Sequence, residues 1–233
     1  MRQFWSLFSK NHQIIMPKYN PEEKHLDIVL IGNFNPRIFQ PQWFSNHNII
    51  SASDHNYIIE NDNVLIHKQI TQFKSSWFRL EITETRMHIS CTQEAYFEAI
   101  IDLLFATFTV LSHTPVSQFG INLTIIQKFD HTEDSEKFEK DYFPTNALSK
   151  LDANVTTFNT KSALNNGNIK IGKSCQIEFS KQQILNSYLI NINQHFELDL
   201  NSDGAEFIKI FGKEARNAVG ASEFVLKSII ENK

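Results

Sequence analysis

Apolar and polar residues alternate through three consecutive segments of the first half of the chain: Val64–Gln72, Trp77–Thr83 and Arg86–Cys91. A period of two is typical of strands with one buried and one solvated face. An unbroken apolar run, Leu26–Ile31, precedes these segments and predicts a buried strand that ends at Gly32. Helical spacing over residues 93–111 predicts a long helix with Thr92 as its N-cap.

The second half of the chain repeats this order. A short acidic helix is predicted over residues 131–143 with Thr132 as its cap, matching a short helix expected from Pro41 in the first half. The closing helix is predicted over residues 205–231, interrupted near Gly220, where Ser222 caps a final turn. Strands are predicted over residues 119–129, 155–158, 169–179 and 188–200.

The matching orders predict an α+β fold with a mostly antiparallel sheet of seven or eight strands. Two similar halves form this sheet, with both long helices packed on one face, and an ancestral duplication is the natural origin of such a pattern. Residue identity between the halves is negligible, so the prediction rests on order and spacing. We divide the chain into an N-terminal extension over residues 1–24, a first half over 25–115 and a second half over 116–233.

Composition supports a large core and an expected cytoplasmic location. The chain of 233 residues has 20 Phe but only 7 Gly and 6 Pro. Many large aromatic side chains and few residues that interrupt helices and strands allow the chain to bury a large core. The net charge of −4 does not favour a nucleic-acid partner, because phosphate binding requires a basic excess. Cys91 and Cys175 lie in alternating stretches and are expected as buried, reduced thiols. No apolar run approaches the roughly 18 residues of a membrane helix.

The segment Gly167–Ser174 (GNIKIGKS) matches the phosphate-loop pattern letter for letter. That chemistry needs a strand before the loop and a helix after it, so that backbone N–H groups converge on phosphate. Here polar residues precede the segment, and the following residues alternate as a strand does. We therefore interpret it as a hairpin loop and strand. Nucleotide binding remains the least favoured alternative, and it predicts thermal stabilisation by ATP or GTP with magnesium.

A polar strand face near the end of the chain is the main candidate for chemistry. Period-two spacing places Asn193, His195 and Glu197 on one face, with Arg79 and His88 on polar faces of earlier strands. A histidine beside a glutamate can perform acid–base catalysis, which makes a hydrolase or nuclease the alternative function. The competing interpretation is the ordinary solvated face of an antiparallel strand. No nucleophile is evident beside these residues, so no catalytic residue is assigned.

The loop Asn33–Phe44 is a second candidate surface. Its aromatic residues and Arg37 could form a lip that binds a partner, or the aromatic residues could cap the core at the end of the first strand. Asn35 and Arg37 are the residues expected to face outward, and Trp43 is included as a binding candidate.

Other motifs give no cofactor or metal site. Asp130–Glu136 holds a histidine and several acids, but its spacing matches no calcium loop and suits a solvated helix N-terminus. The basic stripe of the last helix is interleaved with acids. The sequence has no G-x-S-x-G, H-E-x-x-H, C-x-x-C or G-x-G-x-x-G motif.

Three strings together resemble a sporadically distributed bacterial family of proteins with no established activity: IVLIGNFNPRIFQPQWF, YLININQHFELD and FIKIFGKEARNAVGASEFVLKSII. The resemblance covers residues 25–231 and carries over no functional residue. Its patchy distribution is similar to that of mobile-island genes, such as defence components and toxin-neutralising partners.

These observations lead to a non-catalytic binding protein as the main hypothesis. An adaptor, an immunity protein or a subunit of a defence complex would use the sheet face or the loop Asn33–Trp43 to hold a protein partner. A homo-oligomer is also compatible with the sequence, whereas a membrane partner is not expected.

Overall fold

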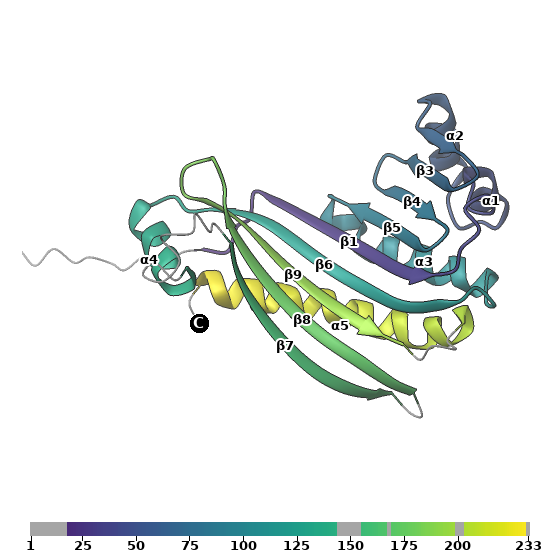
Figure 1. The fold of residues 1–233 in the computed structure, drawn as a ribbon. Coiled ribbons are helices and arrows are strands. Elements are labelled where there is room, and N and C mark those ends of the chain that lie inside the picture. The colour runs from purple at the N-terminus through teal and green to yellow at the C-terminus, as the bar shows by residue number, and fades with distance from the viewer. Residues whose placement is uncertain (1–17, 144–154, 167–168, 199–202, 232–233) are drawn as a thin grey trace, which may run out of the picture.

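The computed structural model describes residues 18–143, 155–166, 169–198 and 203–231, and its strands form one nine-stranded antiparallel sheet (Figure 1). The strand order is β2-β3-β4-β5-β1-β6-β9-β8-β7. The strands are β1 (Glu23–Gly32), β2 (Val64–Ile66), β3 (Ile70–Lys74), β4 (Arg79–Thr83), β5 (Arg86–Cys91), β6 (Val116–Lys128), β7 (Val155–Asn166), β8 (Ile169–Lys181) and β9 (Ser187–Glu197). The helices are α1 (Pro41–Asn46), α2 (Ala52–Glu60), α3 (Phe97–Val110), α4 (Thr132–Tyr142) and α5 (Gly204–Glu231). The predicted α+β class with an antiparallel sheet is confirmed.

The two halves meet at the centre of the sheet. Strands β1 and β6 pair antiparallel there, with Asp27 opposite Asn122. Outward from this pair, β5, β4 and β3 follow on one side, and β9, β8 and β7 follow on the other. Helix α3 comes after β5 along the chain as α5 comes after β9. The two halves thus share a general order of strand, short helix, strands and long helix, but the first half has an additional helix, α2, and an additional strand, β2. Their origin by duplication stays a prediction.

The ninth strand arises within the segment that was predicted as one strand over residues 64–72. A two-residue turn divides it into β2 and β3, closed by the amide of His67, which donates to the carbonyl of Ile70 at 2.8 Å. The turn residues, Lys68 and Gln69, include no glycine or proline, so the usual signal of a two-residue hairpin turn is missing. The one local sign of the turn is Lys68, which interrupts the apolar series of Val64, Ile66 and Ile70.

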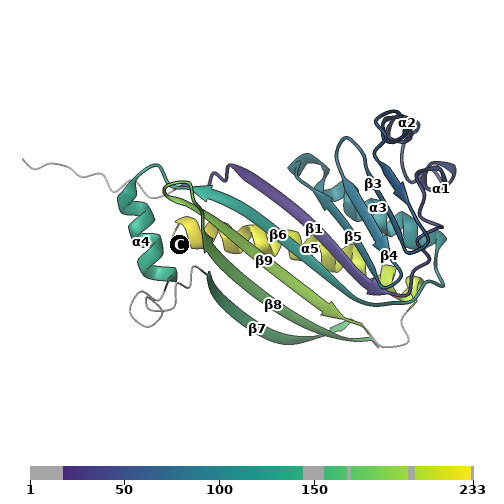
Figure 2. The same cartoon turned by 45° about the horizontal axis from the view of Figure 1, so that its top comes forward.

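The core lies between one face of the sheet and the helices. In the views of Figures 1 and 2, the central strands pass in front of α5. Phe119 of β6 stacks on Phe196 of β9 with ring centroids 4.4 Å apart, and Phe207 and Phe211 of α5 pack edge-on against Phe119. Arg216 of α5 forms ion pairs with two acids of α3, so the long helices are also tied to each other.

Three helix boundaries differ from the sequence prediction. A short 3₁₀ turn (Glu94–Tyr96) precedes α3, so Thr92 is not its N-cap. The N-cap of α4 is His131 rather than Thr132. Helix α5 runs without a break through Gly220. The predicted interruption is wrong because the buried Ser222 hydroxyl bonds to a side chain of the sheet and is not used as a cap.

Helix α2 was missed by the sequence analysis. Its N-cap is Ser51, whose hydroxyl accepts from the amide of Asp54, while the Asp54 carboxylate accepts from the Ser51 amide. This reciprocal capping box is a local signal that could have predicted the helix.

The remaining predictions concern the thiols and the chain ends. Cys91 is buried and Cys175 is half-buried, and no disulfide joins them. Burial raises the pKa of both thiols. Residues 1–17 of the predicted extension over residues 1–24 lie outside the described residues. Strand β1 already begins at Glu23, within the range that was predicted as extension. The end of the predicted strand over 188–200 lies outside them as well.

Candidate functional site

One face of the sheet has no described helix over it, and we call it the open face. The opposite face contacts four of the described α-helices: α3 packs on β5, α5 packs on β6 and β9, Phe44 of α1 packs on Phe73 of β3, and Phe138 of α4 packs on Phe179 of β8. Ile58 of α2 belongs to the same buried cluster. The open face consists of the alternate residues of each strand, and these are mostly half-buried and polar. Such one-sided burial is common for antiparallel sheets.

Strand register places His88 and His195 in one row across the open face. His88 is paired with Val29, Val29 with Gly120, and Gly120 with His195. Three strand spacings therefore separate the two histidines, about 14 Å at about 4.8 Å per strand. They share a face but do not converge. The acid–base site that the hydrolase alternative would build from both of them is not formed.

The first polar group on this face is the His88 cluster, which consists of Asp27, Arg79, His88 and Ser90. His88 Nε2 lies 2.7 Å from Asp27 Oδ1, a hydrogen-bonding distance across neighbouring strands. Ser90 is in register with both Asp27 and Arg79. A serine, a histidine and an aspartate are thus neighbours, but catalysis requires the hydroxyl to bond the histidine ring. Among the described residues the Ser90 hydroxyl makes no such bond, so the cluster is a hydrogen-bonded histidine–aspartate pair with polar neighbours.

The second polar group is the His195 cluster, which consists of Asn122, Asn193, His195 and Glu197. His195 Nε2 lies 3.9 Å from Glu197 Oε1, and the Glu197 side chain is 65% exposed. Asn193 is in register with Asn122. An exposed contact of this length between polar side chains contributes little to stability. Amide side chains both donate and accept hydrogen bonds, which suits recognition of polar partner groups.

The loop that follows β1 forms a separate surface. Phe34, Phe39 and Phe44 are buried at the end of the core, so the core-capping interpretation is confirmed for Phe34 and Phe39. It is wrong for Ile38, which is exposed. Asn35 and Arg37 are exposed, and the Asn35 side chain accepts from the Arg37 amide at 3.2 Å. Both line a cavity of about 330 Å³ together with Asn33, Phe34, Pro36, Lys68 and Glu84.

Trp43, the third binding candidate of this loop, does not line that cavity. It is half-buried and packs on the ring of His47, with centroids 4.6 Å apart. The structure therefore keeps Asn35 and Arg37 together at the loop surface and places Trp43 elsewhere.

The phosphate-loop match lies in a hairpin. Strand β8 begins at Ile169 and the chain then turns into β9, so no helix follows the motif. Lys173 and Ser174 lie on opposite faces: Ser174 is in register with His195 on the open face, and Lys173 Nζ lies 5.1 Å from the centroid of the Phe196 ring. Gly167 and Asn168 are outside the described residues. The helix that a phosphate loop requires is absent from this part of the chain.

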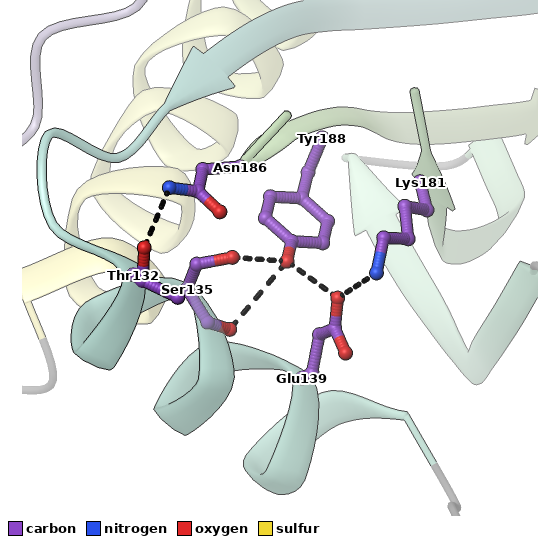
Figure 3. Close-up of polar contacts among 6 residues, drawn as sticks. All are labelled: Thr132, Ser135, Glu139, Lys181, Asn186 and Tyr188. Atoms are coloured by element: carbon purple, nitrogen blue, oxygen red, sulfur yellow. Dashed lines mark hydrogen bonds and ion pairs between the residues drawn. The ribbon is translucent and has the colours of Figure 1, made fainter. Parts of the chain in front are cut away.

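A polar network around Tyr188 was missed by the sequence analysis (Figure 3). The Tyr188 hydroxyl donates to Glu139 Oε1 at 2.8 Å and lies 2.6 Å from Ser135 Oγ, and Lys181 Nζ pairs with the same Glu139 oxygen. Burial is the main cause that raises the pKa of Tyr188 to about 12. Burial alone would raise the pKa of Glu139, but hydrogen bonds from Lys181 and Tyr188 outweigh it and lower the pKa. This network fixes α4 to the sheet, and no sequence pattern within a single segment predicts it.

Lys24 forms a second charged centre outside the open face. Its Nζ lies 2.6 Å from Glu94 Oε1 and 3.2 Å from Glu223 Oε1, over the ring of Tyr19. Burial alone would lower the pKa of Lys24, but the hydrogen bonds to the two carboxylates raise it. A cavity of about 640 Å³ adjoins this lysine at the start of β1.

Comparison with known proteins gives no assignment. No protein-family model matches the chain, and no curated protein matches it. Within the described ranges, no three His, Cys, Asp or Glu side chains are arranged to hold a metal ion. No helix in those ranges is long and apolar enough to cross a membrane.

Proposed function

We propose that the protein is a non-catalytic binding protein that holds a protein partner on the open face of its sheet. The observation that carries this proposal is the packing of α1, α3, α4 and α5 on the other face, which leaves no described helix over the open face. Half-buried Val29 and Ile31 of the central strand lie on the open face between the two polar clusters. Apolar groups framed by polar ones are typical of protein interfaces. An adaptor or an immunity subunit, as the resemblance implies, would need such a surface.

Gly120 offers a direct test, because it lies at the centre of the open face. A Cβ added there meets no atom closer than 3.9 Å, so Gly120→Arg places a long charged side chain on the face without a backbone clash. Gly220 on α5 is the matched control, since a Cβ added there meets nothing within 4 Å and lies on a helix instead. Asn193→Arg is a second open-face variant.

The experiment captures partners with tagged protein from the native host. We expect the wild-type protein and Gly220→Arg to retain the same partner, and both open-face variants to lose it. A second copy as the partner would give a dimer in light scattering that the open-face variants dissociate. A wild-type protein that stays monomeric and captures nothing would overturn the proposal, as would open-face variants that capture the same partner as the wild type.

A further inference from the structure

Strand β2 forms one edge of the sheet and pairs only with β3. The Lys74 amide donates to the Asn63 carbonyl at 3.1 Å, and the His67 amide donates to the Ile70 carbonyl at 2.8 Å. Because these directions alternate along an antiparallel strand, Val64 and Ile66 point their N–H and C=O groups away from β3. The edge therefore offers four backbone groups to another strand.

Large apolar side chains flank this edge. Leu65 is 52% exposed, Ile66 is 44% exposed, and Ile59 near the end of α2 is 54% exposed. Natural edge strands are usually protected by short length, lysines, prolines or bulges that discourage pairing. Strand β2 is short, with three residues, but residues 64–66 include no lysine, proline or bulge, so their side chains leave the edge open to a further strand.

A pair of cations lies beside the edge on the open face. Lys74 and Arg79 are directly opposite each other on β3 and β4, and both are exposed. Like charges in this position are destabilising, and neither residue has an ion pair within the described part of the chain. They line a cavity of about 300 Å³ together with Leu65 of the edge strand and Asp62. Two cations and one carboxylate therefore meet here, so this corner has a local positive excess in a protein with a net charge of −4.

We propose that β2 accepts an extended, acidic segment of a protein partner as an additional strand. The backbone of the segment pairs with Val64 and Ile66, its apolar side chains contact Leu65 and Ile66, and a carboxylate contacts Lys74, with Arg79 on the next strand adding to the positive potential. Addition of a strand to an exposed edge is an established mode of peptide recognition, in which backbone bonds give affinity and side-chain sites give specificity. This inference rests on the proposed binding function and names the partner's chemistry.

A second copy of the chain fits this edge less well. In a two-fold antiparallel pair of β2 strands, His67 and Lys68 of the second copy come to the Asn63 end, beside Lys74 and Arg79. Lys68 would then add a third cation to Lys74 and Arg79, against the single carboxylate of Asp62. The charge at this corner therefore favours an acidic segment from another protein.

The test selects displayed random 12-residue peptides on the full-length protein and measures the affinity of the enriched peptides. We expect enriched sequences in which acidic residues flank alternating apolar residues. Lys74→Glu combined with Arg79→Glu should weaken binding at least ten-fold. The charge-matched control, Lys209→Glu with Lys213→Glu on exposed positions of α5, should bind as the wild type does.

Ile66→Pro tests the edge itself. It removes the outward N–H of Ile66 and leaves the bonds to β3 intact, so it should also weaken binding at least ten-fold. Peptides methylated at alternate backbone nitrogens test the same bonds without changing the protein, and methylation at the pairing positions should abolish binding.

Three results would overturn the proposal: no enrichment of acidic peptides, binding that survives both Ile66→Pro and backbone methylation, or binding of a dT20 oligonucleotide to Lys74 and Arg79 without peptide binding. The last result would make the partner a nucleic acid. If peptide selection fails while Gly120→Arg still removes the host partner, strand addition at β2 is rejected and partner binding on the open face is retained.

Discussion

Gln194, in the middle of β9, donates a side-chain hydrogen to the hydroxyl of Ser222 on α5 at 2.8 Å, and the same nitrogen bonds the carbonyl of Ala218 at 2.7 Å. Both side chains are buried. A glutamine in the inward series of an otherwise apolar strand is costly unless its amide is satisfied, and here α5 satisfies it. The link also fixes the helix along the strand, since sliding by one residue would leave the amide unpaired.

Replacement of Ser222 by alanine should destabilise the protein by about 1–3 kcal/mol, because a buried amide loses a partner. Ser228→Ala is the matched control: its hydroxyl bonds the Phe224 carbonyl within the same helix but is exposed. Urea unfolding of both variants measures the difference in free energy. Equal stabilities would show that the Gln194–Ser222 bond does not contribute.

Glycines at two positions should respond oppositely to alanine. Gly220→Ala should stabilise α5 by about 0.5–1 kcal/mol, because glycine is unfavourable within a helix and the added Cβ meets nothing within 4 Å. Gly32→Ala should destabilise by about 1–3 kcal/mol, because its Cβ would lie 2.2 Å from the Pro115 carbonyl oxygen. Thermal and urea unfolding report both changes. A destabilising Gly220→Ala would favour the helix interruption that the sequence analysis predicted.

Much of the fold follows from periodicity alone. Burial repeats every second residue in a strand, so the inward series Met87, Ile89 and Cys91 could be identified without knowledge of its neighbours. The face that carries His88 and His195 was identified in the same way. The distance between these histidines could not be predicted, because it depends on which strands separate β5 from β9.

Contacts between distant segments account for what the sequence analysis missed. Asp27 and His88 are 61 positions apart, and only the antiparallel pairing of β1 with β5 brings them together. Tyr188 and Glu139 are 49 positions apart and meet because α4 packs on the end of β9. A pattern within one segment contains no information on such partners.

Loss of the Tyr188 hydroxyl should loosen α4. Tyr188→Phe keeps the ring in its aromatic cluster but removes the bonds to Ser135 and Glu139, which should cost about 1–2 kcal/mol. Amide hydrogen exchange should rise in α4 more than in α5. Uniform exchange across both helices would contradict the role assigned to the network.

The same hydroxyl predicts a change at alkaline pH. Its pKa in the folded protein is about 12, against an ordinary value of 10.0. A raised folded pKa means that the neutral hydroxyl contributes stability that is complete below pH 10.0 and lost as the pH rises towards 12. The difference in unfolding free energy between wild type and Tyr188→Phe should therefore shrink over this interval. A constant difference would contradict the assignment.

At acid pH the Glu139 carboxylate should become the sensitive group. Its pKa is lowered below the ordinary value of 4.5, since the bonds from Lys181 and Tyr188 outweigh the opposing effect of burial. A lowered folded pKa means that the carboxylate contributes stability that is complete well above 4.5 and lost as the pH falls through the folded value. Glu139→Gln retains a hydrogen-bond acceptor for Tyr188 but cannot titrate.

The measurement compares the unfolding free energies of the wild type and Glu139→Gln between about pH 6 and about pH 3. The wild type should be more stable near pH 6, and its advantage should decline towards pH 3, because protonation removes the charge that attracts Lys181. Lys181→Met should reduce this pH dependence. The variant loses the bond from Lys181, so only the bond from Tyr188 opposes the effect of burial on the pKa of Glu139. If the advantage of the wild type stayed constant over this range, the carboxylate of Glu139 would not be the group that holds α4 to the sheet.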